Sequence, residues 1–362
     1  MVGRKQESDR SGAVRKRAIM VGAGGFAGVW IREFLPVFEE RLEVVALVDQ
    51  DPLALGRGAG VLGLRPEQTF IDMARAFGSV DADFAILAIP PGPRLRAVAL
   101  AAERHLAVLC EKPLADSWNN SLAVLRLAEQ ADLKLSVVQN YRYSRRIMTL
   151  KWLLHSGALG ELNTIAVRFA VDFRVDTAGG AFRHGIPDAM LYEGAVHHFD
   201  QLRNLGEADA AWISGRSWNR AWSTFANDCC AEFMIGLENG VIAHYEMNNI
   251  ARGQQHGWHQ EGVRIEAEGG SVVLDADGTV RTIRHLGQGH ERVADVPQVE
   301  IERDEHFLVI SEFLDWLDGG PVPSTEVHDN IRTAALAFGA VEASRTGTVV
   351  DVADMLARAG VG

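Results

Sequence analysis

The sequence predicts an α/β domain with a doubly wound parallel sheet, followed by an α+β domain with a large, mostly antiparallel open sheet. In the first part of the chain, continuous apolar runs alternate with amphipathic stretches, as they do where helices cover both faces of a parallel sheet. A glycine-rich turn follows the first of these runs. After about residue 145, extended segments are joined by Asn-Gly, Gly-Gly and Asp-Gly pairs, which favour antiparallel hairpins.

Composition narrows the class of protein. The chain has 362 residues, of which 47% are hydrophobic and 23% charged. This length exceeds that of one ordinary domain, so we expect about two domains. Its formal net charge of −12 argues against nucleic acids and anionic membranes as partners. Three cysteines, two of them adjacent, give no disulfide framework. Since no apolar stretch resembles a signal peptide or a membrane span, we expect a cytoplasmic protein.

The first domain is expected over residues 16–142, after a polar tail at residues 1–15 that we expect to be disordered. Its apolar runs have the length of strands, and the stretches between them repeat apolar residues at helical spacing. The expected strands are AIMVG, LEVVALVD, ADFAILAIP, LAVLCE and LKLSVVQ, and the helices include RLRAVALAAERH and NNSLAVLRLAEQAD.

The second domain, over residues 143–362, is expected to bind the substrate and to oligomerise. A helix in RRIMTLKWLLHSG leads into the extended segment ELNTIAVRFAVDFRV. Hairpins follow, with turns at Asn239-Gly240, Gly269-Gly270 and Asp277-Gly278. A helical segment is expected near residues 190–206, and the C-terminal helices are candidates to pack back on the first domain.

A nucleotide site is predicted at the first glycine-rich turn. Gly22, Gly24 and Ala27 have G-x-G-x-x-A spacing, which gives a tight turn, close approach to a pyrophosphate and close packing of helix on strand. Asp49 stands where an acid should bind the ribose, and because an acid repels a 2′-phosphate, NAD is preferred over NADP, although Arg57 is near. The alternative is a structural turn with a surface aspartate. The predicted cofactor-binding residues are Gly22, Gly24, Gly25, Phe26, Ala27, Asp49, Ile89, Pro90, Pro91, Glu111 and Lys112.

The stretch MLYEGAVHHFDQLRNLGE predicts a line of polar groups on one helix. At helical spacing, Glu193, His197, Asp200 and Asn204 share one stripe, and His198 falls towards the apolar side, where we expect it to be packed. The stripe supports acid–base chemistry, whereas the alternative is a solvated face with one histidine.

The stretch LCEKPLAD brings Lys112 out just past the fifth expected strand, where parallel sheets bind ligands. Pro113 restricts the backbone on both sides of the bond that joins it to Lys112, and a cis bond is possible there. A lysine beside an oxidised nicotinamide would have a lowered pKa and could transfer protons. The alternative is a solvated lysine before a helix-starting proline.

Together these residues resemble the glucose–fructose oxidoreductase, inositol dehydrogenase and rhizopine-catabolism (Gfo/Idh/MocA) family. The resemblance extends over nearly the whole chain and is carried by GAGGFAGVW, VDQDP, AIPPGP, CEKPLA, NYRYSRRIMTLKWLLHSGALGEL and EGAVHHFDQLRNLG. It implies that Lys112 is the active-site lysine, that His197 is the catalytic histidine and that Asp200 contacts substrate hydroxyls.

This chain also departs from the family pattern at particular positions. Glu193 stands where the family typically has aspartate, Ala195 where it usually has glycine, and Arg94 where many members have histidine. These differences suggest an unusual substrate within the family.

The resemblance implies hydride transfer between NAD(H) and a secondary alcohol or ketone of a sugar, inositol, related polyol or sugar acid. We expect His197 to exchange the hydroxyl proton, Lys112 to stabilise the alkoxide, and Glu193 to fix the imidazole tautomer. Arg142, Tyr143 and Arg183 are expected on the substrate side, the loop at residues 172–189 could close over the ligand, and no metal is expected.

Other readings stay open. The cofactor could remain bound and be recycled, as in glycoside hydrolysis through transient oxidation or in sugar–sugar oxidoreduction. A non-catalytic NAD-sensing regulator is a third possibility. We also expect a homo-dimer or homo-tetramer, because the tryptophans at positions 212, 218 and 222 could cover an apolar face of the second sheet, although they could equally belong to the core.

Overall fold

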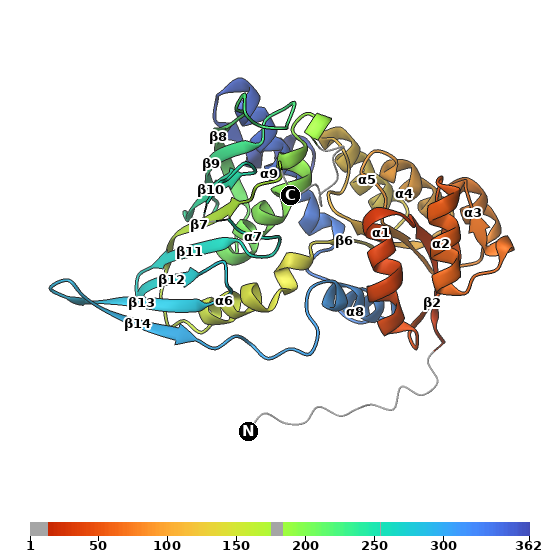
Figure 1. Cartoon of the computed structure of the whole chain (residues 1–362), viewed down its shortest axis with the longest axis horizontal. Coiled ribbons are helices and arrows are strands. Elements are labelled where there is room, and N and C mark those ends of the chain that lie inside the picture. Colours follow the sequence, from red (N-terminus) through yellow and green to blue (C-terminus); the bar gives the residue numbers. More distant parts are fainter. Residues whose placement is uncertain (1–13, 175–183, 254) are drawn as a thin grey trace.

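Parallel strands form the sheet of the first domain in the computed structural model, which describes residues 14–174, 184–253 and 255–362. The strand order is β3-β2-β1-β4-β5-β6, and every pairing is parallel, so the doubly wound fold is confirmed (Figure 1). The sequence did not indicate β3, which is too short for a periodic signal. The strands are β1 (Lys16–Val21), β2 (Leu42–Val48), β3 (Thr69–Phe70), β4 (Phe84–Leu87), β5 (Ala107–Glu111) and β6 (Leu135–Val138).

Helices cover both faces of this sheet because alternate strand residues point to opposite sides. In β1, Ile19 and Val21 belong to one apolar core, and Ala18 and Met20 belong to another. One face is covered by α3 (Met73–Ser79), α4 (Arg94–Glu103), α5 (Trp118–Gln130) and the start of α9 (Val327–Thr346). The other face is covered by α1 (Gly25–Val29), the π-helix η1 (Trp30–Phe34), the 3₁₀ helix η2 (Leu35–Phe38), α2 (Pro52–Leu62) and α8 (His306–Leu317).

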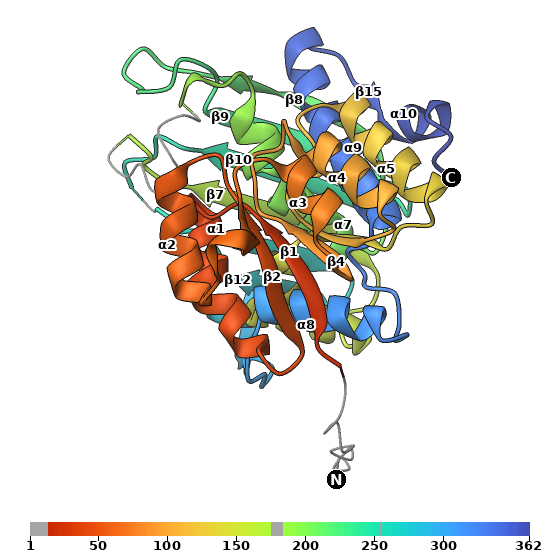
Figure 2. The same ribbon diagram turned by 90° about the vertical axis from the view of Figure 1, so that its right-hand side faces the viewer.

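The C-terminal part of the chain completes the first domain. Phe313 of α8 is fully buried in the same core as Met20 of β1 and Phe84 of β4, and α9 packs against α5. Figure 2 shows α8 beside β1 and β2, and α9 beside α5. The C-terminal helices α8 and α9 therefore pack on the first domain because, without them, apolar surface of the parallel sheet would be exposed to water.

The second sheet has the order β14-β13-β12-β11-β7-β10-β9-β8-β15. Among the described strands of this sheet, only β7 and β10 pair in parallel, so the mostly antiparallel sheet is confirmed. The predicted turns at Gly240 and Gly278 have φ of 88° and 89°, which glycine adopts without strain. The strands are β7 (Leu162–Ala170), β8 (Ala210–Trp218), β9 (Cys230–Leu237), β10 (Ile242–Asn248), β11 (Gly262–Ala267), β12 (Gly270–Leu274), β13 (Val280–Gly287), β14 (His290–Val296) and β15 (Val350–Asp351).

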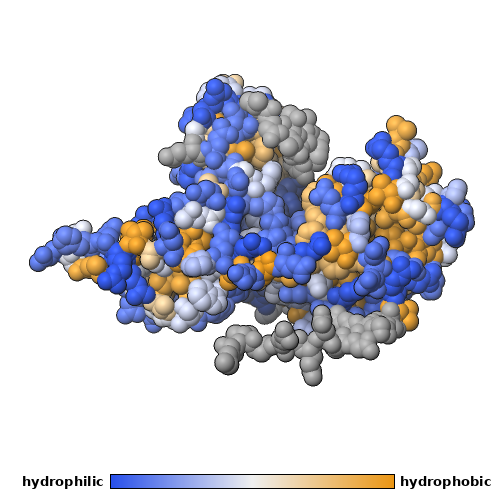
Figure 3. Space-filling view, turned by 60° about the horizontal axis from the view of Figure 1, so that its bottom comes forward, coloured by the Kyte–Doolittle hydropathy of each residue, from blue (hydrophilic) through white to orange (hydrophobic). Residues whose placement is uncertain are grey.

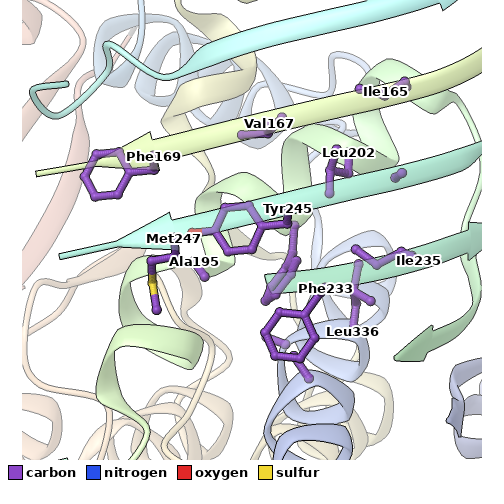
Figure 4. Packing of buried hydrophobic residues seen from close by; sticks show 14 of the residues in the cluster. Ile165, Val167, Phe169, Ala195, Leu202, Phe233, Ile235, Tyr245, Met247 and Leu336 are labelled. Carbon is purple, nitrogen blue, oxygen red and sulfur yellow. The ribbon is translucent and has the colours of Figure 1, made fainter. Parts of the chain in front are cut away.

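One face of this sheet is buried beneath helices, and the other carries a shallow hollow. On the buried face, Val167 and Tyr245 point towards Ala195 and Leu202 on the helical side (Figure 4). The opposite face has a hollow of about 600 Å³ with mixed charges at its lining, among them Arg168. The helices of this part are the 3₁₀ helix η4 (Asn140–Tyr143), α6 (Arg145–His155), the π-helix η6 (Met190–Gly194), α7 (Val196–Gly206) and α10 (Val352–Arg358).

The surface view in Figure 3 is mostly hydrophilic, which agrees with the charge of the chain, and it is recessed between the two domains. Of the helices in the described part of the chain, none is both long and apolar enough to cross a membrane.

Candidate active site

The predicted cofactor-binding residues lie together at the carboxyl edge of the parallel sheet. β1 ends before Gly22, β4 ends before the turn at residues 88–93, and β5 ends at Glu111. Because neighbouring parallel strands end at the same edge, these segments meet although they are far apart in the sequence.

The glycine-rich turn has the close approach that its spacing predicted. Gly22 has φ of 107°, and a Cβ atom there would overlap the carbonyl oxygen of Ala88. Gly24 caps α1 without any side-chain hydrogen bond, and a Cβ on Gly25 would meet nothing within 4 Å. The turn therefore leaves the start of α1 open to a phosphate group, so the residues present fit a dinucleotide.

Asp49 lies beside this turn. Its Oδ2 accepts hydrogen bonds from the main-chain N–H groups of Ala23 and Gly24, at 2.7 and 3.2 Å. Its Oδ1 accepts one from the N–H group of Asp51 at 2.8 Å. The carboxylate is thus fixed at the end of β2, next to the place where the ribose of a dinucleotide is expected.

Glu111 holds the segment that carries Lys112. Its Oε1 accepts a hydrogen bond from Trp30 Nε1 at 2.9 Å, and its Oε2 accepts one from the Lys112 N–H group at 3.2 Å. Burial raises the pKa of Glu111, but the hydrogen bond and charge of His306 and the charge of Lys112 outweigh it and lower the pKa. The buried carboxylate is therefore ionised, and it anchors the main chain beside Pro113.

Lys112 reaches across to the second domain. The Lys112–Pro113 bond is cis, and the lysine Nζ donates a hydrogen bond to the main-chain oxygen of Glu193 at 2.8 Å. Glu193 belongs to η6, which leads directly into α7 and His197. The first-domain lysine and the second-domain histidine are therefore brought to the same region.

His197 is a buried, neutral imidazole. Its ring stacks on Tyr141, with centroids 4.1 Å apart and planes 11° apart, and it is 5% exposed. Burial, followed by the positive charges of Lys112 and His198, holds the pKa of His197 well below its usual value. A neutral imidazole can accept a proton at one ring nitrogen.

That Glu193 fixes the imidazole tautomer of His197 stays a prediction. Within the described residues, Nδ1 of His197 is buried and has no hydrogen-bond partner, so Glu193 does not orient the ring through that atom. Residues 190–194 form a π-turn, so Glu193 is not on the regular α-helix that carries His197.

Asp200 and Arg142 form a buried ion pair. Arg142 Nε and Nη2 donate to the two oxygens of Asp200 at 2.7 and 2.6 Å, and Thr333 donates to Oδ1 at 2.8 Å. Asp200 is 0% exposed. All of α7 is buried, and substrate contact by Asp200 and Arg142 stays a prediction.

The other predicted residues fall in different places. Tyr143 donates a hydrogen bond to Glu312 at 2.5 Å and packs in the first-domain core. His198 is packed as expected, between Tyr245 at 2.7 Å and Glu261 at 3.2 Å. Half of the predicted closing loop, residues 175–183 with Arg183, lies outside the described residues.

Sequence reasoning missed several side chains at the site. Tyr141 lies between His197 and His259, whose ring centroid is 4.2 Å away, and its buried hydroxyl lacks a hydrogen-bond partner among the described residues. His306 stacks on Phe34 at 4.5 Å, 3.6 Å from Glu111. Arg94, which the sequence singled out only as a departure from the family pattern, donates a hydrogen bond to the main-chain oxygen of Lys112 at 3.1 Å. No periodicity or spacing relates these residues, because packing between distant segments brings them together.

Comparison with known proteins gives a consistent result. Residues 16–139 match the model described as an oxidoreductase family with an NAD-binding Rossmann fold, and residues 147–273 match the GFO/IDH/MocA C-terminal domain. The chain is 35% identical to the uncharacterized protein y4oX of Sinorhizobium fredii over 94% of this chain and 96% of that protein.

More distant relatives have named activities or ligands. The chain is 25% identical to the D-apiose dehydrogenase of Rhizobium rhizogenes, over 94% of this chain and 98% of that protein. An oxidoreductase from Agrobacterium radiobacter, solved with NAD⁺, L-tartaric acid and magnesium, has a TM-score of 0.82 at 23% identity and covers 95% of this chain and 100% of its own. That likeness shows a shared fold over both domains.

Proposed function

Because the chain belongs to the Gfo/Idh/MocA family of NAD-binding oxidoreductases, we propose that it transfers a hydride between NAD(H) and a secondary alcohol or ketone of a sugar, inositol, related polyol or sugar acid. The observation that carries this proposal is the reach of Lys112 from the cofactor edge to the turn that precedes His197. The names of the D-apiose dehydrogenase and the inositol 2-dehydrogenase of Saccharopolyspora erythraea support the substrate class.

NAD, when bound, supplies C4 of its nicotinamide as hydride acceptor or donor. The residues of the glycine-rich turn and the turn at residues 88–93 would hold it, and Asp49 would face its ribose. The neutral imidazole of His197 accepts the proton of the substrate hydroxyl. The ammonium group of Lys112 stabilises the negative charge that develops on the substrate oxygen.

The experiment is a screen of sugars, inositols and sugar acids for NAD⁺ reduction, with NADH binding measured separately by fluorescence. Lys112→Ala should bind NADH but lose turnover by roughly 10²–10⁴-fold, as expected when a group that assists proton transfer is removed. Lys16→Ala is the matched control, because Lys16 pairs with Asp318 at the start of β1. Full turnover in Lys112→Ala would contradict the proposal.

The same screen separates the other readings. A cofactor that co-purifies with the protein, together with substrate conversion that forms no net NADH, would favour the recycled-cofactor reaction. NADH binding with no conversion of any compound would favour a sensor.

A further inference from the structure

Arg94 joins two main-chain segments at the cofactor edge. It is the first residue of α4 and is only 3% exposed. Its Nε and Nη2 donate to the carbonyl oxygen of Ile89 at 2.9 and 2.7 Å, and Nη2 also donates to that of Lys112 at 3.1 Å. Its Nη1 donates to the carbonyl oxygens of Glu111 and Pro113.

These segments leave neighbouring strands and would otherwise separate. Leu87 of β4 pairs with Cys110 of β5, and the pairing between these two strands ends there, although β5 continues to Glu111 beside β6. Beyond this point, the guanidinium group of Arg94 joins the two segments by hydrogen bonds to the main-chain oxygens of Ile89 and Lys112. A planar fork of five N–H donors suits this role, whereas the ammonium group of a lysine could not reach several separated acceptors in fixed directions.

The cost of this arrangement argues against a neutral packing role. The described hydrogen bonds of Arg94 all go to carbonyl oxygens, so its charge is compensated by dipoles and not by a carboxylate. Burying a charge is expensive unless its hydrogen bonds are well formed. An apolar residue would fill the space at lower cost, but it could not hold the backbone of residues 111–113 against residue 89.

The same segment is also held from its other side. The carboxylate of Glu111 is fixed by Trp30 Nε1 and by the N–H group of Lys112, while Arg94 fixes the carbonyl groups of residues 111–113. Both the N–H and the C=O group of Lys112 are therefore constrained, and the direction in which its side chain leaves the sheet is set from both sides.

We propose that Arg94 is a positioning residue that fixes Lys112 relative to the cofactor turn at residues 88–93. This inference rests on the proposed function for the role of Lys112, but it adds a residue that the chemistry does not itself require. Arg94 acts through the main chain of Ile89 on the cofactor side and through the main chain of Lys112 on the proton-transfer side.

The test compares Arg94→Ala and Arg94→Lys with Arg96→Ala, an exposed arginine on the same helix. For each variant, the NADH dissociation constant, kcat, KM and melting temperature are measured, with and without added methylguanidinium. In Arg94→Ala we expect kcat to fall by about 10²-fold, since a displacement of about 1 Å can have that effect. We expect the NADH dissociation constant to rise about tenfold, from loss of charge-assisted hydrogen bonds behind the cofactor turn.

Methylguanidinium should restore both quantities in Arg94→Ala without an equal change in melting temperature, and methylammonium at the same ionic strength should not. Arg94→Lys keeps the positive charge but loses the planar set of guanidinium donors. Its kcat and NADH affinity should therefore stay below those of the wild-type protein. Wild-type kcat and NADH affinity in either variant would overturn the proposal, as would loss of the folded protein in both variants, because that outcome assigns Arg94 to stability alone.

The NADH titration separates this proposal from the proposed function. If the wild-type protein binds NADH but converts no compound in the screen, the proposed function fails. A weakened and methylguanidinium-restored NADH affinity in Arg94→Ala would still support the positioning of the cofactor turn by Arg94.

Discussion

The Nζ atom of Lys112 lies 2.8 Å from the main-chain oxygen of Glu193, so a residue at the end of a parallel strand meets the turn before a helix of the second domain. A carbonyl oxygen is a neutral acceptor, and the bond can be exchanged for one to a substrate oxygen without leaving a charge unpaired. The contact thus fixes the lysine side chain beside the turn that leads to His197.

The buried state of His197 predicts a pH dependence of stability. Its pKa in the folded protein is lowered, first by burial and then by the charge of Lys112, so the unfolded state binds a proton more readily. The unfolding free energy should therefore fall as the pH drops from about 8 to about 5, through the ordinary histidine pKa near 6.5. Urea unfolding at several pH values measures it. His197→Asn should show a smaller loss, and an identical slope in that variant would contradict the assignment.

The pair of Asp200 and Arg142 predicts a loss of stability and not of substrate affinity. Asp200→Asn removes one of the two carboxylates that pair with the buried guanidinium group of Arg142 and leaves only Asp329. The unfolding free energy should fall by about 3 kcal/mol, the lower end of the range for a broken buried ion pair. Denaturant titration checks this, with Asp81→Asn as control, because Asp81 is 89% exposed in its pair with Arg17. An Asp200→Asn variant with wild-type stability and a raised KM would contradict this prediction and would indicate that Asp200 contacts the substrate.

Gly22 and Gly56 predict opposite results for the same substitution. Gly22→Ala places a Cβ atom against the carbonyl oxygen of Ala88 at a φ of 107°, so the turn must shift, and NADH affinity should fall by about tenfold or more. At Gly56, inside α2, a Cβ meets nothing within 4 Å, so Gly56→Ala should raise stability by about 0.5–1 kcal/mol with unchanged NADH affinity. Equal NADH affinity in both variants would show that the turn is not at the cofactor.

Much of the fold could be predicted because its signals are local. The strands of the first sheet are continuous apolar runs, and the hairpins of the second are marked by residues that tolerate positive φ, such as Gly240 and Gly278. The placement of Gly22 and Lys112 at one edge follows from strand direction alone. By contrast, the short strand β3 is held by its neighbour β2, and two residues carry no periodic pattern.

The site was less predictable because partner choice is decided by packing. Glu193, His197 and Asp200 share one stripe only on a regular α-helix, and the π-turn at residues 190–194 breaks that regularity. Asp200 pairs with Arg142 from η4, while His197 stacks on Tyr141. Neither the spacing of residues nor the composition of the sequence indicates the π-turn or these pairings.

The sequence by itself determined the two-domain architecture, the glycine-rich turn and the strand end that presents Lys112, because strand periodicity and the conformational freedom of glycine act over short distances. Only the tertiary structure decided which polar side chains face the site and which neutralise one another, and it alone brought Arg94 against the carbonyl groups beside Lys112. Those outcomes depend on contacts between segments far apart in the chain, where burial makes each polar group take the partner that packing brings within reach.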